Sequence, residues 1–116
     1  MRRDTFFWFD PSVHSKPNQN YLSKLRRRGI RIEGFASMPG LQDAIAKLPP
    51  KKKVKVISAA SHFKQYSSKL LNEPRIAAIF LFCQNRDRAE ALMKEFPSIR
   101  KTAFTIEELI EMLKEE

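Results

Sequence analysis

The apolar run from Ile76 to Cys83, IAAIFLFC, is the most continuous in the chain and carries no charge. A half-exposed antiparallel strand alternates apolar and polar residues, whereas a strand covered on both faces is apolar throughout. The run therefore predicts a central strand of a parallel sheet with helices packed against both sides.

Four other segments have the composition of short strands. A short run of β-branched and aromatic residues that ends at turn-forming residues is typical of a strand. The first such run ends at Asp10-Pro11. The four segments are Thr5 to Phe9, Ile30 to Phe35, Lys53 to Ala60 and Lys101 to Phe104.

The segments between these strands carry apolar residues at the spacing of a helix with one buried face. Gly29, Pro49-Pro50, Pro74 and Pro97 mark helix ends. Thr105 and Glu108 form a T-x-x-E capping box, which predicts the start of the last helix. The helical segments are Asn18 to Arg28, Leu41 to Leu48, Phe63 to Leu71 with Tyr66, Leu70 and Leu71 on its apolar face, Ala89 to Phe96, and Thr105 to Leu113.

The alternation of strands and helices predicts an α/β fold. Right-handed crossovers then give a parallel five-stranded sheet with helices on both faces, and the default strand order is 2-1-3-4-5. We expect a doubly wound (βα)5 three-layer sandwich of the flavodoxin-like or receiver-like class. At 116 residues the chain is expected to form a single domain, residues 1–116.

The single cysteine, Cys83, excludes an intrachain disulfide, and its apolar surroundings predict a buried reduced thiol. No apolar run approaches the ~18 residues of a transmembrane helix, and residues 1–10 do not resemble a signal peptide. We therefore expect an intracellular domain, in the cytoplasm or the nucleus. The three glycines are widely separated and form no phosphate-binding loop, so we expect no bound cofactor.

In an open parallel sheet of this kind, ligands bind beyond the carboxyl ends of the strands. This rule selects candidate partner-binding residues after the first, third and fourth strands. They are Asp10, His14, Ser58, Ser61, His62, Gln84 and Asn85.

Asp10 allows two interpretations. A carboxylate directly after an apolar strand can bind a divalent cation. Asp-Pro-Ser is also a common turn sequence, in which the carboxylate accepts hydrogen bonds from backbone amides. His14 and His62 lack the spacing of metal ligands, so we expect no metal site. Ser58 and Ser61 lack a nucleophile-elbow motif and are expected to be loop or cap residues.

The formal net charge of +9 favours an anionic partner, and many of the cations are expected at the amino ends of the strands. Cations at helix carboxyl ends account for Arg26 to Arg28 but not for Lys51 to Lys55. The candidate anion-binding residues are Arg26, Arg27, Arg28, Arg31, Lys51, Lys52, Lys53, Lys55, Arg100 and Lys101, and Arg2, Arg3 and Arg75 are placed at the same end.

Trp8, Asp10, Val13, Asn18 and Tyr21 follow a recognisable pattern in which a Trp-x-Asp strand end precedes a Val, an Asn and a Tyr. The pattern resembles an N-terminal receiver-like domain of large eukaryotic multidomain proteins of rotifers and ciliates, which often continue into tetratricopeptide repeats or an ADP-ribosyltransferase domain. The resemblance covers nearly the whole chain, and Ala59 stands where that pattern has a glycine. It extends over Val56-Ile57-Ser58, Ile79 to Cys83, and Phe104 to Ile110.

The architecture also resembles that of response-regulator receivers, which carry acids after the first strand and a phosphoacceptor Asp at the end of the third. They also have a Ser or Thr ending the fourth strand and a Lys ending the fifth. Only Asp10 corresponds here, because the third strand ends in Ser58-Ala59, the fourth in Cys83-Gln84 and the fifth in Phe104-Thr105. The resemblance implies a pseudo-receiver that transfers no phosphoryl group.

Three functions remain open from the sequence. The first is a non-catalytic interaction or signalling module with a protein partner. The second is a domain that binds nucleic acid or another acidic surface through the basic end. The third is an enzyme acting on a nucleotide or nucleotide-sugar with Asp10 in the crevice.

Overall fold

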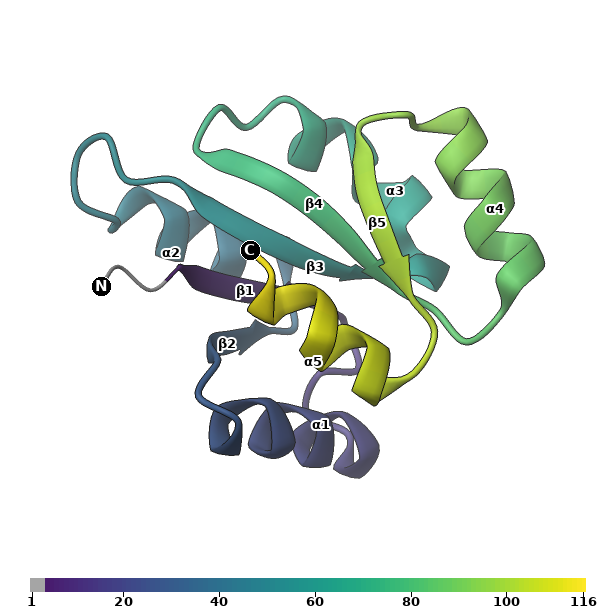
Figure 1. The fold of residues 1–116 in the computed structure, drawn as a ribbon. Coiled ribbons are helices and arrows are strands. Elements are labelled where there is room, and N and C mark those ends of the chain that lie inside the picture. Colours follow the sequence, from purple (N-terminus) through teal and green to yellow (C-terminus); the bar gives the residue numbers. More distant parts are fainter. Residues whose placement is uncertain (1–3) are drawn as a thin grey trace.

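The computed structural model describes residues 4–116, which form a single sheet covered by helices (Figure 1). The strands are β1 (Thr5–Phe9), β2 (Arg31–Phe35), β3 (Val54–Ala59), β4 (Ile76–Phe82) and β5 (Ile99–Ala103). The helices are α1 (Lys16–Arg27), α2 (Met38–Ala46), α3 (Ala60–Leu71), α4 (Arg86–Glu95) and α5 (Ile106–Lys114).

The five strands are all parallel and lie in the order β2-β1-β3-β4-β5. The predicted fold class and strand order are therefore confirmed, and the chain has a doubly wound, flavodoxin-like α/β sandwich. Among residues 4–116 no helix is long and apolar enough to cross a membrane.

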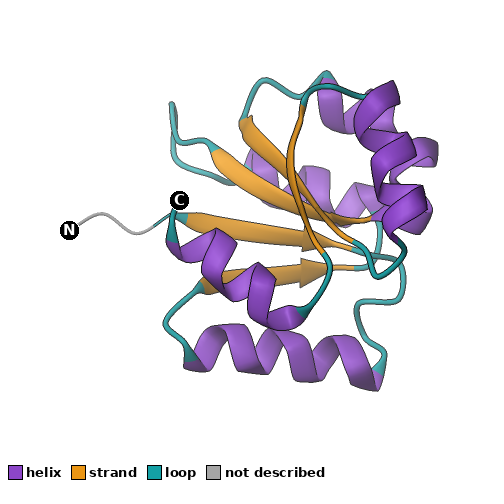
Figure 2. Cartoon of the chain, turned by 45° about the vertical axis from the view of Figure 1, so that its right-hand side comes forward, coloured by secondary structure: helices purple, strands orange, loops and turns teal. Residues whose placement is uncertain are grey.

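Helices cover both faces of the sheet (Figure 2). Successive side chains of a strand point to opposite faces, so β1 sends Phe7 and Phe9 into a core shared with α2, α3 and α4. Its residues Phe6 and Trp8 enter the other core, which is shared with α1 and α5. The central strand β4 is likewise buried on both sides, as its continuous apolar run predicts.

Several element boundaries differ from the prediction. β5 begins at Ile99, two residues before the predicted start, because a turn bond from its N–H to the Phe96 carbonyl brings the chain directly into register with Ile79. α2 ends at Ala46, and Leu48 lies in a turn closed by its bond to the Ile45 carbonyl.

Two local features predicted from the sequence, the capping box of α5 and the glycine after α1, are confirmed, and the predicted burial of Leu71 is wrong. The predicted capping box of α5 is present, since Thr105 and Glu108 each accept from the other's backbone N–H. Gly29 follows α1 with a φ of 84°, the left-handed conformation that suits glycine. Leu71, predicted on the apolar face of α3, is 37% exposed because it lies in the last turn beside the buried Leu70.

Candidate functional site

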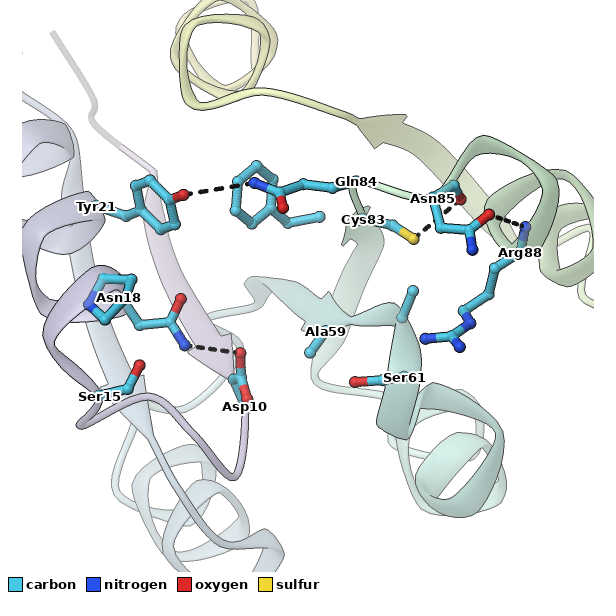
Figure 3. A pocket seen from close by; sticks show the side chains of 13 residues that line it. Asp10, Ser15, Asn18, Tyr21, Ala59, Ser61, Cys83, Gln84, Asn85 and Arg88 are labelled. Atoms are coloured by element: carbon cyan, nitrogen blue, oxygen red, sulfur yellow. Dashed lines mark hydrogen bonds between the residues drawn. The ribbon is translucent and has the colours of Figure 1, made fainter.

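A cavity of about 400 Å³ opens where β1, β3 and β4 end (Figure 3). This place is the switch point of the fold, since the chain leaves β1 and β3 on opposite sides of the sheet. The first turns of α1, α3 and α4 and the residues that follow the strands line this strand-end cavity. Polar and charged lining residues are Asp10, Ser15, Asn18, Tyr21, Ser61, Gln84, Asn85 and Arg88.

Asp10 adopts the turn geometry that was one of its two interpretations. Its Oδ1 accepts the Ser12 N–H at 2.8 Å, and its Oδ2 accepts from the Asn18 side-chain amide at 3.1 Å. The Asp10 carbonyl also accepts the Val13 N–H at 2.8 Å. The buried carboxylate thus ties β1 to the first turn of α1, and it reaches the strand-end cavity with both oxygens engaged.

Two helices begin at the cavity without a side-chain cap. Ser15 precedes α1 and Ala59 precedes α3, and neither side chain accepts a hydrogen bond from its helix. The first N–H groups of a helix have no partner within it and carry the positive end of the helix dipole. Both first turns therefore favour negative charge in the cavity.

Arg88 supplies a full positive charge to the same space. Asn85 caps α4 by accepting the Arg88 N–H at 3.0 Å, and the Cys83 thiol donates to the Asn85 carbonyl at 3.2 Å. Figure 3 shows the Arg88 guanidinium reaching from α4 toward the start of α3, where Ser61 lies. A cation in the first turn of a helix opposes the helix dipole, and this local mismatch is the sequence signal for Arg88 that sequence reasoning missed.

An aromatic wall closes one side of the cavity. Tyr21 of α1 lies 5.3 Å from the Phe82 ring, and its hydroxyl accepts from the Gln84 amide at 3.5 Å. Trp8 stacks behind Tyr21 with ring centroids 6.4 Å apart. In the sequence, Tyr21 belongs to the first helical segment and to the pattern that starts at Trp8, but neither predicts a place at the cavity, because helical spacing does not distinguish the core from the end of a sheet.

The predicted crevice residues divide into two groups. Asp10, Ser61, Gln84 and Asn85 come together around the cavity. His14 is exposed and His62 half-buried, and neither lines it. Ser58 is fully buried, and its hydroxyl donates to the Ala59 carbonyl at 3.2 Å.

The charged side chains that line the cavity are Asp10 and Arg88. Among the described residues that line it, Asp10 is the carboxylate, and no histidine is present to act as a base. Within residues 4–116 no group of three or more His, Cys, Asp or Glu side chains is placed to hold a metal ion.

The basic residues at the other rim, beside the amino ends of the strands, have mixed surroundings. Lys55 pairs with Asp4 at 2.6 Å and with Glu116 at 3.4 Å, and Arg100 pairs with the same Glu116. Lys101 pairs with Glu115 at 3.7 Å, and Arg26 donates to the Ile32 carbonyl at 3.1 Å.

The other predicted cations of this rim differ in their exposure. Arg27, Arg28 and Arg31 are exposed, whereas Arg75 is half-buried. Arg2 and Arg3 lie outside the described residues. The remaining predicted cations, Lys51, Lys52 and Lys53, line a second cavity together with Lys55.

Comparison with models of known protein families gives no match, and comparison with curated proteins gives none. Among solved structures, the chain is similar to a de novo designed Rossmann 2x3 fold protein determined by solution NMR, with a TM-score of 0.64 and 13% sequence identity. The alignment covers 96% of this chain and 86% of the designed protein. At this identity the likeness concerns the fold alone, a doubly wound parallel α/β sandwich.

Proposed function

We propose that the chain is a non-catalytic binding module, receiver-like in architecture, that takes an anionic group of a protein partner into the strand-end cavity. The observation that carries this proposal is the Arg88 guanidinium, which faces the first turn of α3 across the cavity. Together with the uncapped start of α1 it surrounds the space with positive potential on several sides.

The charge of Asp10 does not cancel this preference. Its two oxygens already accept hydrogen bonds from the Ser12 N–H and the Asn18 amide, and these neutral donors solvate the carboxylate without removing its charge. An anion can therefore be held by Arg88, by the first N–H groups of α3 and by the Ser61 hydroxyl, without contact with Asp10.

The same residues support a binding role over a catalytic one. A receiver that accepts a phosphoryl group needs a carboxylate at the end of the third strand, and here Ser58 occupies that region with its side chain fully buried. The engaged oxygens of Asp10 also leave little room for a cation. The chain is therefore proposed as a pseudo-receiver of the cytoplasm or nucleus, where the buried Cys83 thiol stays reduced.

The test is an NMR titration of the protein with a peptide carrying one phosphoserine, with the unphosphorylated peptide as reference. We expect the phosphopeptide to shift the amide signals of Ser61 and Asn18. Arg88→Gln should weaken this binding about tenfold, because it removes a charge-assisted hydrogen bond.

Arg86→Gln is the matched control, since Arg86 lies in the same first turn but stacks on Phe104, outside the cavity lining. Equal weakening by both variants would contradict the proposed site. Turnover of a nucleotide or nucleotide-sugar that is lost in Asp10→Asn would favour the enzyme interpretation instead.

A second candidate function is the binding of nucleic acid or another polyanion at the amino ends of the strands. The observation that favours it is the second cavity, which four lysines line together. Such a clustering of like charge lowers stability in the unbound protein and is offset when a polyanion binds.

A further inference from the structure

The second cavity lies at the rim opposite the strand-end cavity. It has a volume of about 370 Å³, within the range of about 300–1,000 Å³ that is usual for small-molecule sites. Lys51, Lys52, Lys53 and Lys55 line it together with Asp4 and Ala77, and we call it the lysine cavity.

The loop that carries three of these lysines is fixed by Arg75. The Arg75 guanidinium donates to the Lys52 carbonyl at 2.8 Å and to the Pro49 carbonyl at 2.7 Å. The Arg75 N–H donates to the Glu73 carboxylate at 3.0 Å, and Val54 donates to the Arg75 carbonyl at 2.9 Å. The backbone of the loop is therefore held before a ligand arrives, which lowers the entropy cost of binding.

Lys51 has an unusual backbone conformation for a lysine. Its φ is 70°, and it is the non-glycine residue with positive φ among residues 4–116. The left-handed region is unfavourable for a residue with a Cβ, and glycine or asparagine is the usual choice. Strain of this kind persists where surrounding structure and function require it.

An irregularity in the sheet opens the floor of the cavity. Val54 pairs with Ile76 and Lys55 with Ala78, so Ala77 is left without a partner in β3. Ala77 is exposed and presents only a methyl group to the cavity. The bulge thus leaves open the space between the start of β4 and the lysines.

The charges around the cavity leave a surplus of cations. Lys55 is paired with Asp4 and Glu116, and its side chain is 17% exposed. Within residues 4–116, no carboxylate forms an ion pair with Lys51, Lys52 or Lys53. The three successive lysines thus keep their charge available for a ligand.

We propose that the lysine cavity binds a compact polyphosphate, a small ligand that carries several phosphate groups. This inference rests on the second candidate function, polyanion binding, and narrows it to a ligand class and a place. Lysine ammonium groups bind phosphate as point charges and suit a closely spaced cluster of them. The described lining contains no aromatic ring on which a nucleic-acid base would stack, which favours a compact ligand over a single strand.

The experiment is isothermal titration of the full chain with inorganic tripolyphosphate, with orthophosphate and a single-stranded oligonucleotide as comparison ligands. We expect tripolyphosphate to bind at least about tenfold more tightly than orthophosphate and to weaken as salt is raised. The variant with Lys51→Gln, Lys52→Gln and Lys53→Gln should lose at least about tenfold in affinity.

A matched triple variant with Lys16→Gln, Lys64→Gln and Lys94→Gln removes the same charge from exposed positions on α1, α3 and α4. It should bind tripolyphosphate within about twofold of the unmodified chain, since these lysines lie outside the cavity. Arg75→Lys keeps the positive charge of this positioning residue but removes the guanidinium that donates to the Pro49 and Lys52 carbonyls. It should lower the affinity and leave the salt dependence unchanged.

The outcomes separate the inference from the candidate function on which it rests. Equal loss of affinity in the two triple variants would overturn the site, because net charge alone would then explain binding. An oligonucleotide that binds while tripolyphosphate does not would overturn the inference and leave polyanion binding standing. Failure of both ligands to bind would overturn both. A thermal melt of each variant checks that the fold is retained, and we expect all of them to unfold cooperatively.

Discussion

Asp10 is a buried carboxylate whose role is set by its nearest donors. Its position after an apolar strand suggested either a ligand site or a turn, and both oxygens are occupied by donors from the following residues. A buried carboxylate needs such donors to offset the loss of water. We infer that Asp10 stabilises the wall of the strand-end cavity, while Arg88 opposite it is available to a ligand.

The first prediction concerns the stability of this turn. Asp10→Ala should lower the free energy of unfolding by about 1–2 kcal/mol, because it leaves the Ser12 N–H without its acceptor and removes one of the two acceptors of the Asn18 amide, which keeps only the Ser12 carbonyl. The measurement is chemical denaturation followed by the fluorescence of Trp8, which is 1% exposed. Asp43→Ala is the control, since its ion pair with Lys47 is solvent-exposed and should change stability by less than about 0.5 kcal/mol. Equal stability of the two variants would contradict the role given to Asp10.

Helices α1 and α5 pack on the same face of the sheet and are also joined at the surface. Lys24 of α1 donates to the Glu107 carboxylate in the first turn of α5 at 3.1 Å. Glu107 lies in the first turn of α5, where the positive end of the helix dipole stabilises its negative charge. The side-chain hydrogen bond from Lys24 and the backbone hydrogen bond at Glu107 lower the pKa of this carboxyl below its ordinary value.

The second prediction follows from that pKa shift. Lys24→Met should raise the pKa of Glu107, measured by a carbon NMR titration of its carboxyl signal, and Lys47→Met should leave it unchanged. Because the folded-state pKa lies below the unfolded one, the contact stabilises the fold above the unfolded pKa. The contribution is lost as the pH falls through the folded-state pKa. An unchanged Glu107 titration in Lys24→Met would show that the contact does not persist in solution.

At the scale of the whole molecule, the sequence carried enough information for the fold and for part of the site. The continuous apolar run of β4 and the residues that end the helices predicted the strand order. That order alone places Asp10, Ser61 and Asn85 at the same rim of the sheet. The direction of a side chain does not follow from topology, since whether Arg88 or Tyr21 faces a cavity depends on how α4 and α1 pack.

The predicted start of β5 is wrong because the end of a strand also depends on packing. β5 starts at Ile99 because this side chain is buried beside β4, although the polar residues that follow it weaken the strand signal. The topology predicted that Lys51, Lys52, Lys53 and Lys55 lie at the amino ends of the strands, but it did not predict the lysine cavity. The lysine cavity lies beside the bulge at Ala77, which the apolar run of β4 did not predict.

The last prediction tests the central strand on which both rims depend. Ile79 is 4% exposed and pairs with Val56 on one side and Ile99 on the other. Ile79→Asp should unfold the domain at room temperature, because an unpaired buried charge costs several kcal/mol against a typical stability of about 5–15 kcal/mol. The measurement is circular dichroism with Trp8 fluorescence.

Ala77→Asp is the control for this substitution, since it places the same charge in the same strand at an exposed position beside four lysines. It should fold and melt cooperatively. A cooperative, near-native melt of Ile79→Asp would mean that β4 is not covered on both faces. In that case the carboxyl ends of the strands would no longer define one rim and the lysines another, and both proposed sites would lose their structural basis.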